Sequence, residues 1–218
     1  MSRIAIYTPN RGQLETEMVS SLIGTLCHPR YREAGVALEI WFVTGDSLIS
    51  RARNDCANAF LRSDADALMF IDSDLTFEPL GVLQLWETGL SLVGGNYPLS
   101  HRSVSSEEQR AVVPIPSGTR EICAISRVAT GFMMIRRECL TKMQPELDKY
   151  QVEDHLQTDF FSPFVDDNEY LSEDYAFVTR ARRAGVTPYI HQGIVLGHIG
   201  RQEWRLDKYE AKEATRAA

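Results

Sequence analysis

Apolar and polar positions alternate in blocks along the first part of this chain. Four short apolar runs have the length of buried strands: residues 4–8, 36–44, 67–71 and 90–95. Three segments between them carry apolar residues at helical spacing: residues 14–26, 48–62 and 79–88. Strands that alternate with helices predict an α/β fold, in which a mainly parallel, doubly wound sheet is flanked by helices.

The spacing within two of these helices predicts the face that each one buries. In the first helix, apolar residues recur every four positions with two more beside them: Leu14, Met18, Leu22 and Leu26, with Val19 and Ile23. In the second helix, the apolar face consists of Ala52, Cys56 and Phe60. We expect both faces to pack against the sheet.

The pattern changes in the second part of the chain. Residues 99–118 are polar and predict a mobile loop, and residues 150–170 are irregular and acidic. Strands are expected at Glu121–Val128, Gly131–Ile135, Pro188–His191 and in the apolar stretch 193–198, and helices from about Arg137 and over Glu173–Ala184. This part is expected to add a smaller antiparallel portion to the same domain, before a charged tail from Arg201.

The composition narrows the classes of partner. The chain has 218 residues, of which 44% are hydrophobic, enough for the core of one domain. Its formal charge of −7 argues against nucleic acid as the main ligand, because nucleic-acid-binding proteins usually present a basic face. Nucleotides stay open, since a bound metal ion supplies positive charge locally.

Two further patterns concern the environment of the protein. No apolar stretch has the length of a membrane span, and the N-terminus lacks a basic region followed by an apolar core. We therefore expect a soluble, cytoplasmic protein without a signal peptide. The cysteines are scattered without a Cys-x-x-Cys pair, which favours buried free thiols over zinc or disulfides at Cys27, Cys56, Cys123 and Cys139.

Two carboxylates directly follow the buried run 67–71. Asp72 and Asp74 stand where this strand leaves the sheet, and ligands of open α/β sheets bind outside that end of the strands. Thr8 and Asp46 end or follow the first two strands and should reach the same edge. Carboxylates in this place suit a hard divalent cation that is shared with substrate phosphates. The alternative is that both aspartates only end the strand and cap the next segment of the chain.

Polar side chains occupy a second face of the helix predicted at 48–62. Arg51, Asn54 and Asn58 fall at positions i, i+3 and i+7, and the first turn of this helix should lie near the edge that holds Asp72. Arg51 could pair with a phosphate, and Asn54 with a ribose or phosphate oxygen. A solvated helix face is the alternative.

Four more positions are candidates for chemistry. Glu173 and Asp174 open a helix after Ser172, where acids complement the helix dipole or where one carboxylate acts as a general base on an acceptor hydroxyl. His198 follows an apolar stretch and is either a metal ligand or a packed side chain. Gly131 either lets the backbone approach a ligand closely or makes a tight bend.

In this order, the segments resemble the GT-A fold of nucleotide-sugar glycosyltransferases, and family 2 in particular. Five segments carry the likeness: Tyr7-Thr8-Pro9-Asn10-Arg11, Phe70-Ile71-Asp72-Ser73-Asp74, Ala129-Thr130-Gly131-Phe132-Met133, Leu171-Ser172-Glu173-Asp174-Tyr175 and Gly197-His198. In that family, the corresponding segments border the nucleotide base, form the Asp-x-Asp metal motif, line the sugar site, start a helix with Glu-Asp and supply a histidine that completes the metal site.

The resemblance implies an organisation and a reaction. Residues 1–98 would form the nucleotide-sugar-binding half of one domain, residues 99–200 the acceptor and catalytic half, and residues 201–218 a tail. The enzyme would move a sugar from a nucleotide diphosphate, a UDP-sugar being the best candidate, to a hydroxyl of a glycan or another acceptor. The loop 99–118 would fold over the bound donor and exclude water.

The resemblance also implies roles for individual residues. Mn²⁺ or Mg²⁺ would be held by Asp72, Asp74 and His198, and an inverting transfer would use Asp174 as the base with Glu173 beside it. Residues implied in nucleotide-sugar binding are Thr8, Pro9, Asn10, Asp46, Arg51, Asn54, Asp72, Ser73 and Gly131.

The chain departs from the family pattern in two places. The acidic cluster after the second strand is reduced to Gly45-Asp46-Ser47, and the Gln-x-x-Arg-Trp motif of processive polysaccharide synthases is absent, which favours non-processive transfer. Two other functions remain. Asp72-Ser73-Asp74-Leu75-Thr76 also fits a phosphatase of the haloacid-dehalogenase type with Asp72 as nucleophile, and a non-catalytic nucleotide-sugar-binding module would keep the metal site without the base.

Overall fold

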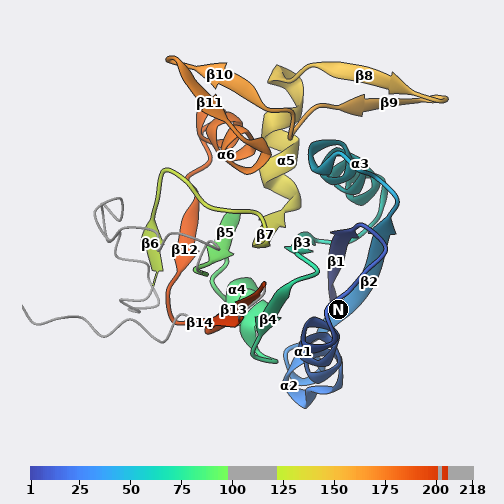
Figure 1. Cartoon of the computed structure of the whole chain (residues 1–218), viewed down its shortest axis with the longest axis vertical. Helices are drawn as coiled ribbons and strands as arrows, with labels where there is room; N and C mark the ends of the chain where they lie inside the picture. The colour runs from blue at the N-terminus through green and yellow to red at the C-terminus, as the bar shows by residue number, and fades with distance from the viewer. Residues whose placement is uncertain (98–121, 201–202, 206–218) are drawn as a thin grey trace, which may run out of the picture.

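A seven-stranded sheet forms the centre of the protein (Figure 1). The computed structural model describes residues 1–97 and 122–200 and the backbone of residues 203–205. In spatial order, the strands are β2 (Val36–Thr44), β1 (Ser2–Asn10), β3 (Ala67–Ile71), β7 (Phe132–Arg136), β5 (Leu92–Gly95), β12 (Tyr189–His191) and β6 (Ile122–Ala124). β7 and β6 run antiparallel to their neighbours and the other five strands are parallel, so the predicted mainly parallel sheet is confirmed.

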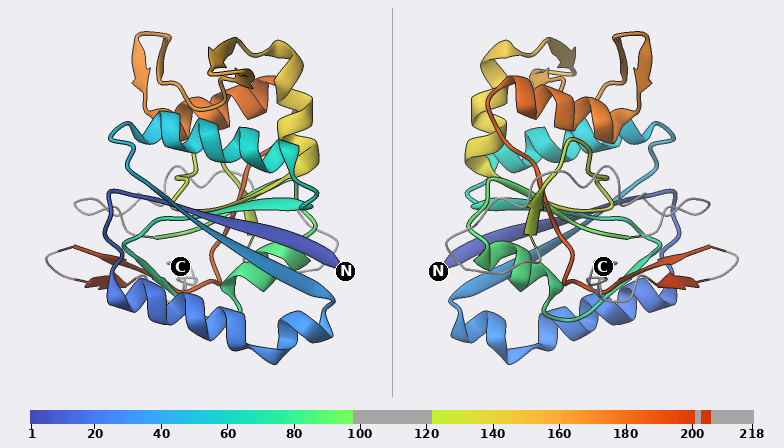
Figure 2. Two further views of the ribbon diagram at one scale, coloured as in Figure 1. Left: turned by 90° about the vertical axis from the view of Figure 1, so that its right-hand side faces the viewer. Right: turned by 90° about the vertical axis from the view of Figure 1, so that its left-hand side faces the viewer.

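Helices cover both faces of this sheet (Figure 2). One face carries α3 (Ile49–Arg62), α5 (Arg137–Met143) with the short helix η2 (Gln144–Glu146), and α6 (Glu173–Arg183); the other carries α1 (Thr16–Cys27), α2 (Pro29–Glu33) and α4 (Gly81–Glu87). Alternate residues of β3 therefore enter two separate cores. Phe70 packs with Phe60 and Phe177 on one side, and Met69 packs with Met18 on the other. A strand buried on both faces has to be apolar throughout, as residues 67–71 are.

The buried face of α1 differs from the predicted one. Met18, Leu22 and Thr25 are buried, whereas Ile23 and Leu26 are 54% and 47% exposed. A strict four-residue spacing advances about 40° around the helix at each step, so its members leave a single face after two steps. The buried face of α3 contains Ala52, Cys56 and Phe60, as predicted.

Residues 150–170, expected to be irregular, form two hairpins: β8 (Lys149–Val152) with β9 (His155–Thr158), and β10 (Phe164–Asp166) with β11 (Glu169–Leu171). The loop between β10 and β11 is Asp167–Asn168, and both residues have positive φ, of 46° and 65°. Two such residues fit a type I′ turn, which is the tight connection that antiparallel strands favour. The sequence contains recognisable turn residues here, but the strands on either side were not predicted, because the segment around them is polar.

A third small sheet lies beside the carboxyl end of β3. It consists of β14 (Glu203–Arg205), β13 (Leu196–Ile199) and β4 (Leu75–Phe77), in that order and antiparallel. These strands and the hairpins form the expected antiparallel portion of the fold. The predicted loop 99–118 and most of the tail lie outside the described residues. Over the part of the chain that the structure describes, no helix has the length and apolarity needed to cross a membrane.

Candidate functional site

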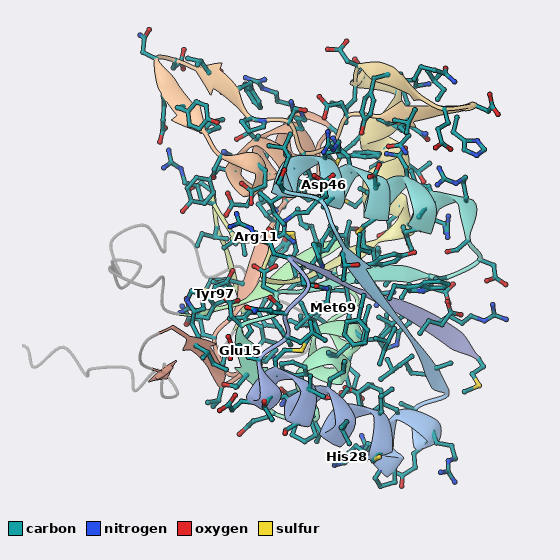
Figure 3. All side chains as sticks on the ribbon, turned by 45° about the vertical axis from the view of Figure 1, so that its right-hand side comes forward. Arg11, Glu15, His28, Asp46, Met69 and Tyr97 are labelled. Atoms are coloured by element: carbon teal, nitrogen blue, oxygen red, sulfur yellow. The ribbon has the colours of Figure 1, made fainter. Side chains whose placement is uncertain are left out.

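The carboxyl ends of β1, β2 and β3 open onto a cavity of about 410 Å³. Seven of the predicted site residues line it: Pro9, Asn10, Asp46, Asp72, Ser73, Asp74 and Glu173. Other lining residues were not predicted, including Arg11, Glu15 and Arg53; Figure 3 shows Arg11, Glu15 and Asp46 along the same side of the molecule. Five carboxylates and two guanidiniums among the described lining residues make this cavity acidic, so an anionic ligand would need a cation to accompany it.

Asp74 and His198 lie together although they are far apart in the sequence. Asp74 directly precedes β4, and His198 stands on β13 opposite Leu75. A backbone hydrogen bond of 2.7 Å from Ile199 N to Asp74 O holds the two segments together. As a result, His198 Nε2 is 3.3 Å from Asp74 Oδ2.

This pair fits a metal site that is completed by substrate. A hard divalent ion at a nucleotide site is commonly held by one or two protein carboxylates together with substrate phosphates and water. Asp74 supplies one such oxygen, and neutral imidazole is a common metal ligand. Within residues 1–97 and 122–200, no cluster of three or more His, Cys, Asp or Glu side chains is arranged for a metal. Asp74 and His198 thus offer two groups to an ion that substrate phosphates would share.

Asp72 makes different contacts from Asp74. Its backbone N–H donates to Gly131 O at 2.8 Å, and its Oδ1 accepts from Arg53 Nη2 at 2.8 Å. One of the two carboxylates that the sequence assigned to the metal, Asp72, is thus paired with a buried guanidinium. We therefore consider the role of Asp72 separately from that of the Asp74–His198 pair.

Gly131 allows a close approach of protein groups. A Cβ at this position would lie 2.3 Å from Tyr97 Oη and 2.8 Å from Asp72 Oδ2. Gly131 N–H donates to Tyr97 Oη at 3.0 Å, and the Tyr97 ring meets the His198 ring edge to face at 5.9 Å. Burial raises the pKa of Tyr97 well above its usual value, and the nearby charge of Asp72 adds to this effect. Tyr97 was missed because it follows the fourth strand without any motif.

Arg51 does not line the cavity. Its Nε and Nη2 bond both carboxylate oxygens of Asp46, at 2.6 and 2.8 Å, and its side chain is 57% exposed. The hydrogen bonds from Arg51 lower the pKa of Asp46, and the Leu48 N–H bond adds to this. In this arrangement, Arg51 orients Asp46 at the rim of the cavity.

The structure does not bring Asn54 to the cavity, and this corrects the expected contact with ribose or phosphate. Asn54 is buried, and its Oδ1 accepts from the N–H groups of Phe160 and Phe161 at 2.8 and 2.9 Å. Its Nδ2 donates to Asp159 Oδ1 at 2.8 Å. Asn58 exchanges similar bonds with the backbone of Thr158. These amides fasten α3 to the end of β9 and the segment after it. The solvated-face alternative is therefore wrong for Asn54 and Asn58, which are buried, whereas Arg51 is exposed.

Thr8 and Asn10 lie at the end of β1, and the hydrogen bonds of the Asn10 side chain go to residues close to it in the sequence. Thr8 is buried and does not line the cavity, and its Oγ1 has no hydrogen-bond partner among the described residues. Asn10 Nδ2 donates to Thr8 O at 3.1 Å, and Asn10 Oδ1 accepts from Gly12 N at 2.9 Å. These bonds shape the turn after β1, which presents Pro9 and Arg11 to the cavity.

Glu173 and Asp174 begin α6 on the opposite side of the cavity, which Glu173 lines and Asp174 does not. Asp174 Oδ1 accepts from the Ser172 hydroxyl and, at 2.9 Å, from the backbone N–H of Tyr175, so its carboxylate is held in one orientation. The Ser172 side chain accepts no hydrogen bond from a backbone N–H of the first turn, contrary to the capping alternative. Glu173 faces the cavity; burial raises its pKa, and the charge of Asp174 raises it further.

Arg53 is the functional candidate that sequence reasoning missed. Its side chain is 3% exposed, lies 5.1 Å from the centre of the Phe70 ring, and reaches both Asp72 and Glu173. A signal for it exists, since Arg53 shares the helical stripe of Cys56, Ala57 and Phe60. An arginine within an apolar stripe needs buried acidic partners.

Similarity to known proteins was found at the level of structure. No family model matches this sequence, and no curated protein matches it. The structure is similar to A197 from STIV, with a TM-score of 0.59 and 16% identity, over 99% of this chain and 100% of A197.

Two other similar structures are those of glycosyltransferases. GalNAc-T7, solved with UDP, GalNAc and Mn²⁺, gives a TM-score of 0.55 at 10% identity, over 97% of this chain and 46% of that protein. A mutant of Drosophila β-1,4-galactosyltransferase 7, solved with manganese, UDP-Gal and xylobiose, gives 0.53 at 18% identity, over 100% of this chain and 80% of that one. At these identities, the likeness is one of fold: the chain has the GT-A fold of glycosyltransferases.

Proposed function

We propose that this protein is a metal-dependent glycosyltransferase, of the family 2 type, that uses a UDP-sugar. The observation that carries the proposal is the Asp74–His198 pair, with 3.3 Å between carboxylate and imidazole, at the edge of an acidic cavity. The GT-A fold supports it, because solved structures of that fold contain UDP and manganese. The acceptor would be a hydroxyl of a glycan or of another molecule, and the transfer non-processive.

In this proposal, residues on one side of the cavity bind the donor, and Asp174 on the other side acts on the acceptor. Asp74 and His198 would hold Mn²⁺ or Mg²⁺, which offsets the negative charge of the diphosphate. Pro9, Asn10 and Asp46 would border the nucleoside. Asp174, oriented by Ser172 and Tyr175, would take the proton from the attacking hydroxyl, with inversion at the sugar carbon.

Asp74→Ala provides the first test. Calorimetry with UDP and MnCl₂ should show binding by the wild type and at least tenfold weaker binding by the variant, since one of two protein ligands is lost. The melting temperature should change little, because the Asp74 side chain is 43% exposed. Asp154→Ala, which removes an exposed carboxylate in the β8–β9 turn, is the matched control and should bind UDP as the wild type does.

Two results would reject the proposal. One is unchanged UDP affinity in Asp74→Ala, which would leave Asp74 as a strand-ending residue. The other is stabilisation of the wild type by beryllium fluoride with Mg²⁺ together with phosphate release from phosphomonoesters, which a phosphatase with Asp72 as nucleophile would show. The pairing of Asp72 with Arg53 at 2.8 Å gives that alternative no support.

A further inference from the structure

Arg53 is a buried cation between two acidic groups from distant parts of the chain. Its Nη2 donates to Asp72 Oδ1 at 2.8 Å, at the end of β3. On the other side, its Nε lies 3.9 Å from Glu173 Oε1, at the start of α6. The guanidinium is therefore shared between the wall that carries Asp72 and the wall that carries Glu173 and Asp174.

Two of the nitrogens of Arg53 lack hydrogen bonds. Nε and Nη1 are both closed to solvent, and neither has a hydrogen-bond partner among the described residues. Buried donors of a charged group are nearly always satisfied. The distance of 3.9 Å from Nε to Glu173 allows charge attraction but exceeds hydrogen-bonding distance.

The accessibility of these two nitrogens distinguishes a ligand-binding role of Arg53 from a role in positioning other residues. Arg53 lines the cavity, but its Nε and Nη1 are closed to solvent and its Nη2 donates to Asp72. The donors of this guanidinium therefore face protein groups, whereas a residue that binds ligand directly would present them to the cavity. Glu173 supplies an acceptor beside Nε, and it lines the cavity itself. A shift of Glu173 by about one ångström would complete the bond.

We propose that Arg53 is a positioning residue, which ties Asp72 to Glu173 and so sets the start of α6, with Asp174, relative to the end of β3. This inference rests on the proposed function in assigning Asp72 to the donor side and Asp174 to the acceptor side. The planar guanidinium serves both carboxylates through different nitrogens. A lysine ammonium is a single point of charge and serves one of them at a time.

A double-mutant cycle tests the link between the two side chains. The variants are Arg53→Lys, Glu173→Gln and the two combined, with Arg62→Lys as the control, since Arg62 is an exposed arginine at the far end of α3. The measurement is the affinity for UDP with MnCl₂. We expect Glu173→Gln to weaken binding at least threefold in the wild type but less than 1.5-fold in Arg53→Lys, because the link is already broken there.

Hydrogen exchange in the ligand-free protein gives a second measurement. Arg53→Lys and Glu173→Gln should each speed exchange at least threefold both after β3, in residues 72–75, and in the first turn of α6. Arg62→Lys should change neither segment. If Arg53→Lys does not fold, Glu173→Asp replaces it, since the shorter side chain withdraws the carboxylate from Arg53 and should speed exchange at the start of α6.

The two proposals fail in different ways. Additive effects on UDP affinity, or exchange that speeds at only one segment, would overturn the positioning role while leaving UDP binding in place. A wild type that binds no UDP, with exchange coupled at both segments, would overturn the proposed function and retain the link. If Arg53→Lys lowers both the melting temperature and the UDP affinity, and the cycle shows no coupling with Glu173, Arg53 has a structural role only.

Discussion

At Gly131, the absence of a side chain lets three groups meet. The backbone N–H bonds the buried hydroxyl of Tyr97, the carbonyl accepts from Asp72 N, and the Asp72 carboxylate lies alongside. The sequence offered two explanations for this glycine, the close approach of a ligand and a tight bend needed for packing. The structure shows close packing of protein groups, and these groups support Asp72 at the cavity.

We therefore expect Gly131→Ala to damage the site. A Cβ at 2.3 Å from Tyr97 Oη and 2.8 Å from Asp72 Oδ2 forces both groups to move, at a cost of about 1–3 kcal/mol in the free energy of unfolding. UDP affinity should fall with it. Urea denaturation and calorimetry measure the two effects.

Tyr97→Phe in the Gly131→Ala background serves as the matched comparison. Removing the hydroxyl relieves the shortest contact, so the double variant should regain part of the lost stability. If Gly131→Ala proves as stable as the wild type and binds UDP equally well, the close approach has no consequence for the site.

Among the elements, α3 depends on an arginine from outside the helix. Arg137, at the start of α5, donates to the carbonyls of Phe60, Leu61, Ser63 and Ala65 over distances of 2.6–3.1 Å. The last carbonyls of a helix have no partners within it, and a cation there also complements the helix dipole. This contact fixes the C-terminal end of α3, whose other turns hold Arg53 and Asn54.

Arg137→Met should destabilise the protein by about 2–3 kcal/mol, because several carbonyls, most of them partly buried, lose a charged donor. Arg62→Met removes an exposed arginine from the same end of α3 and should change stability by less than about 0.5 kcal/mol. Urea denaturation distinguishes them. Equal stability of the two variants would show that water replaces the Arg137 bonds without cost.

Across the whole molecule, buried thiol and phenol groups make the free energy of unfolding depend on pH in the alkaline range. Burial raises the pKa of Cys56 and of Cys139 from 9.0 to about 12, and that of Tyr7 from 10.0 to about 12. Above pH 9, the unfolded chain releases protons that the folded protein keeps. These groups therefore stabilise the fold fully below pH 9, and the contribution is lost as the pH rises towards 12.

Urea denaturation at pH 8, 9.5 and 11 should show stability falling steadily over this range. Cys56→Ala removes one of the responsible groups and should make the decline shallower, although it also leaves a small cavity. Cys27→Ala, at an exposed cysteine, should leave the slope as in the wild type. A constant free energy of unfolding up to pH 11 would contradict the assignment.

Local sequence patterns were enough for most of the secondary structure. The strands β2 and β3 and the apolar face of α3 were predicted correctly. β3 is covered on both sides and α3 packs on the sheet, so both need apolar residues at fixed short spacings. The hairpins at residues 150–170 were missed, since short strands in a polar segment show no such period.

The site was decided by tertiary structure. Arg51 and Arg53 are two residues apart, which on a helix turns their side chains to nearly opposite directions, so one pairs with Asp46 at the rim and the other is buried between Asp72 and Glu173. Motif order suggested Asp74 and His198 as partners, but only the pairing of β4 with β13 sets their distance of 3.3 Å. The sequence by itself determined which segments bury apolar surface, because that depends on neighbouring residues. Which polar side chains share a site depends also on contacts between distant segments, such as Asp74 with His198 and Arg53 with Glu173, and those exist only in the folded chain.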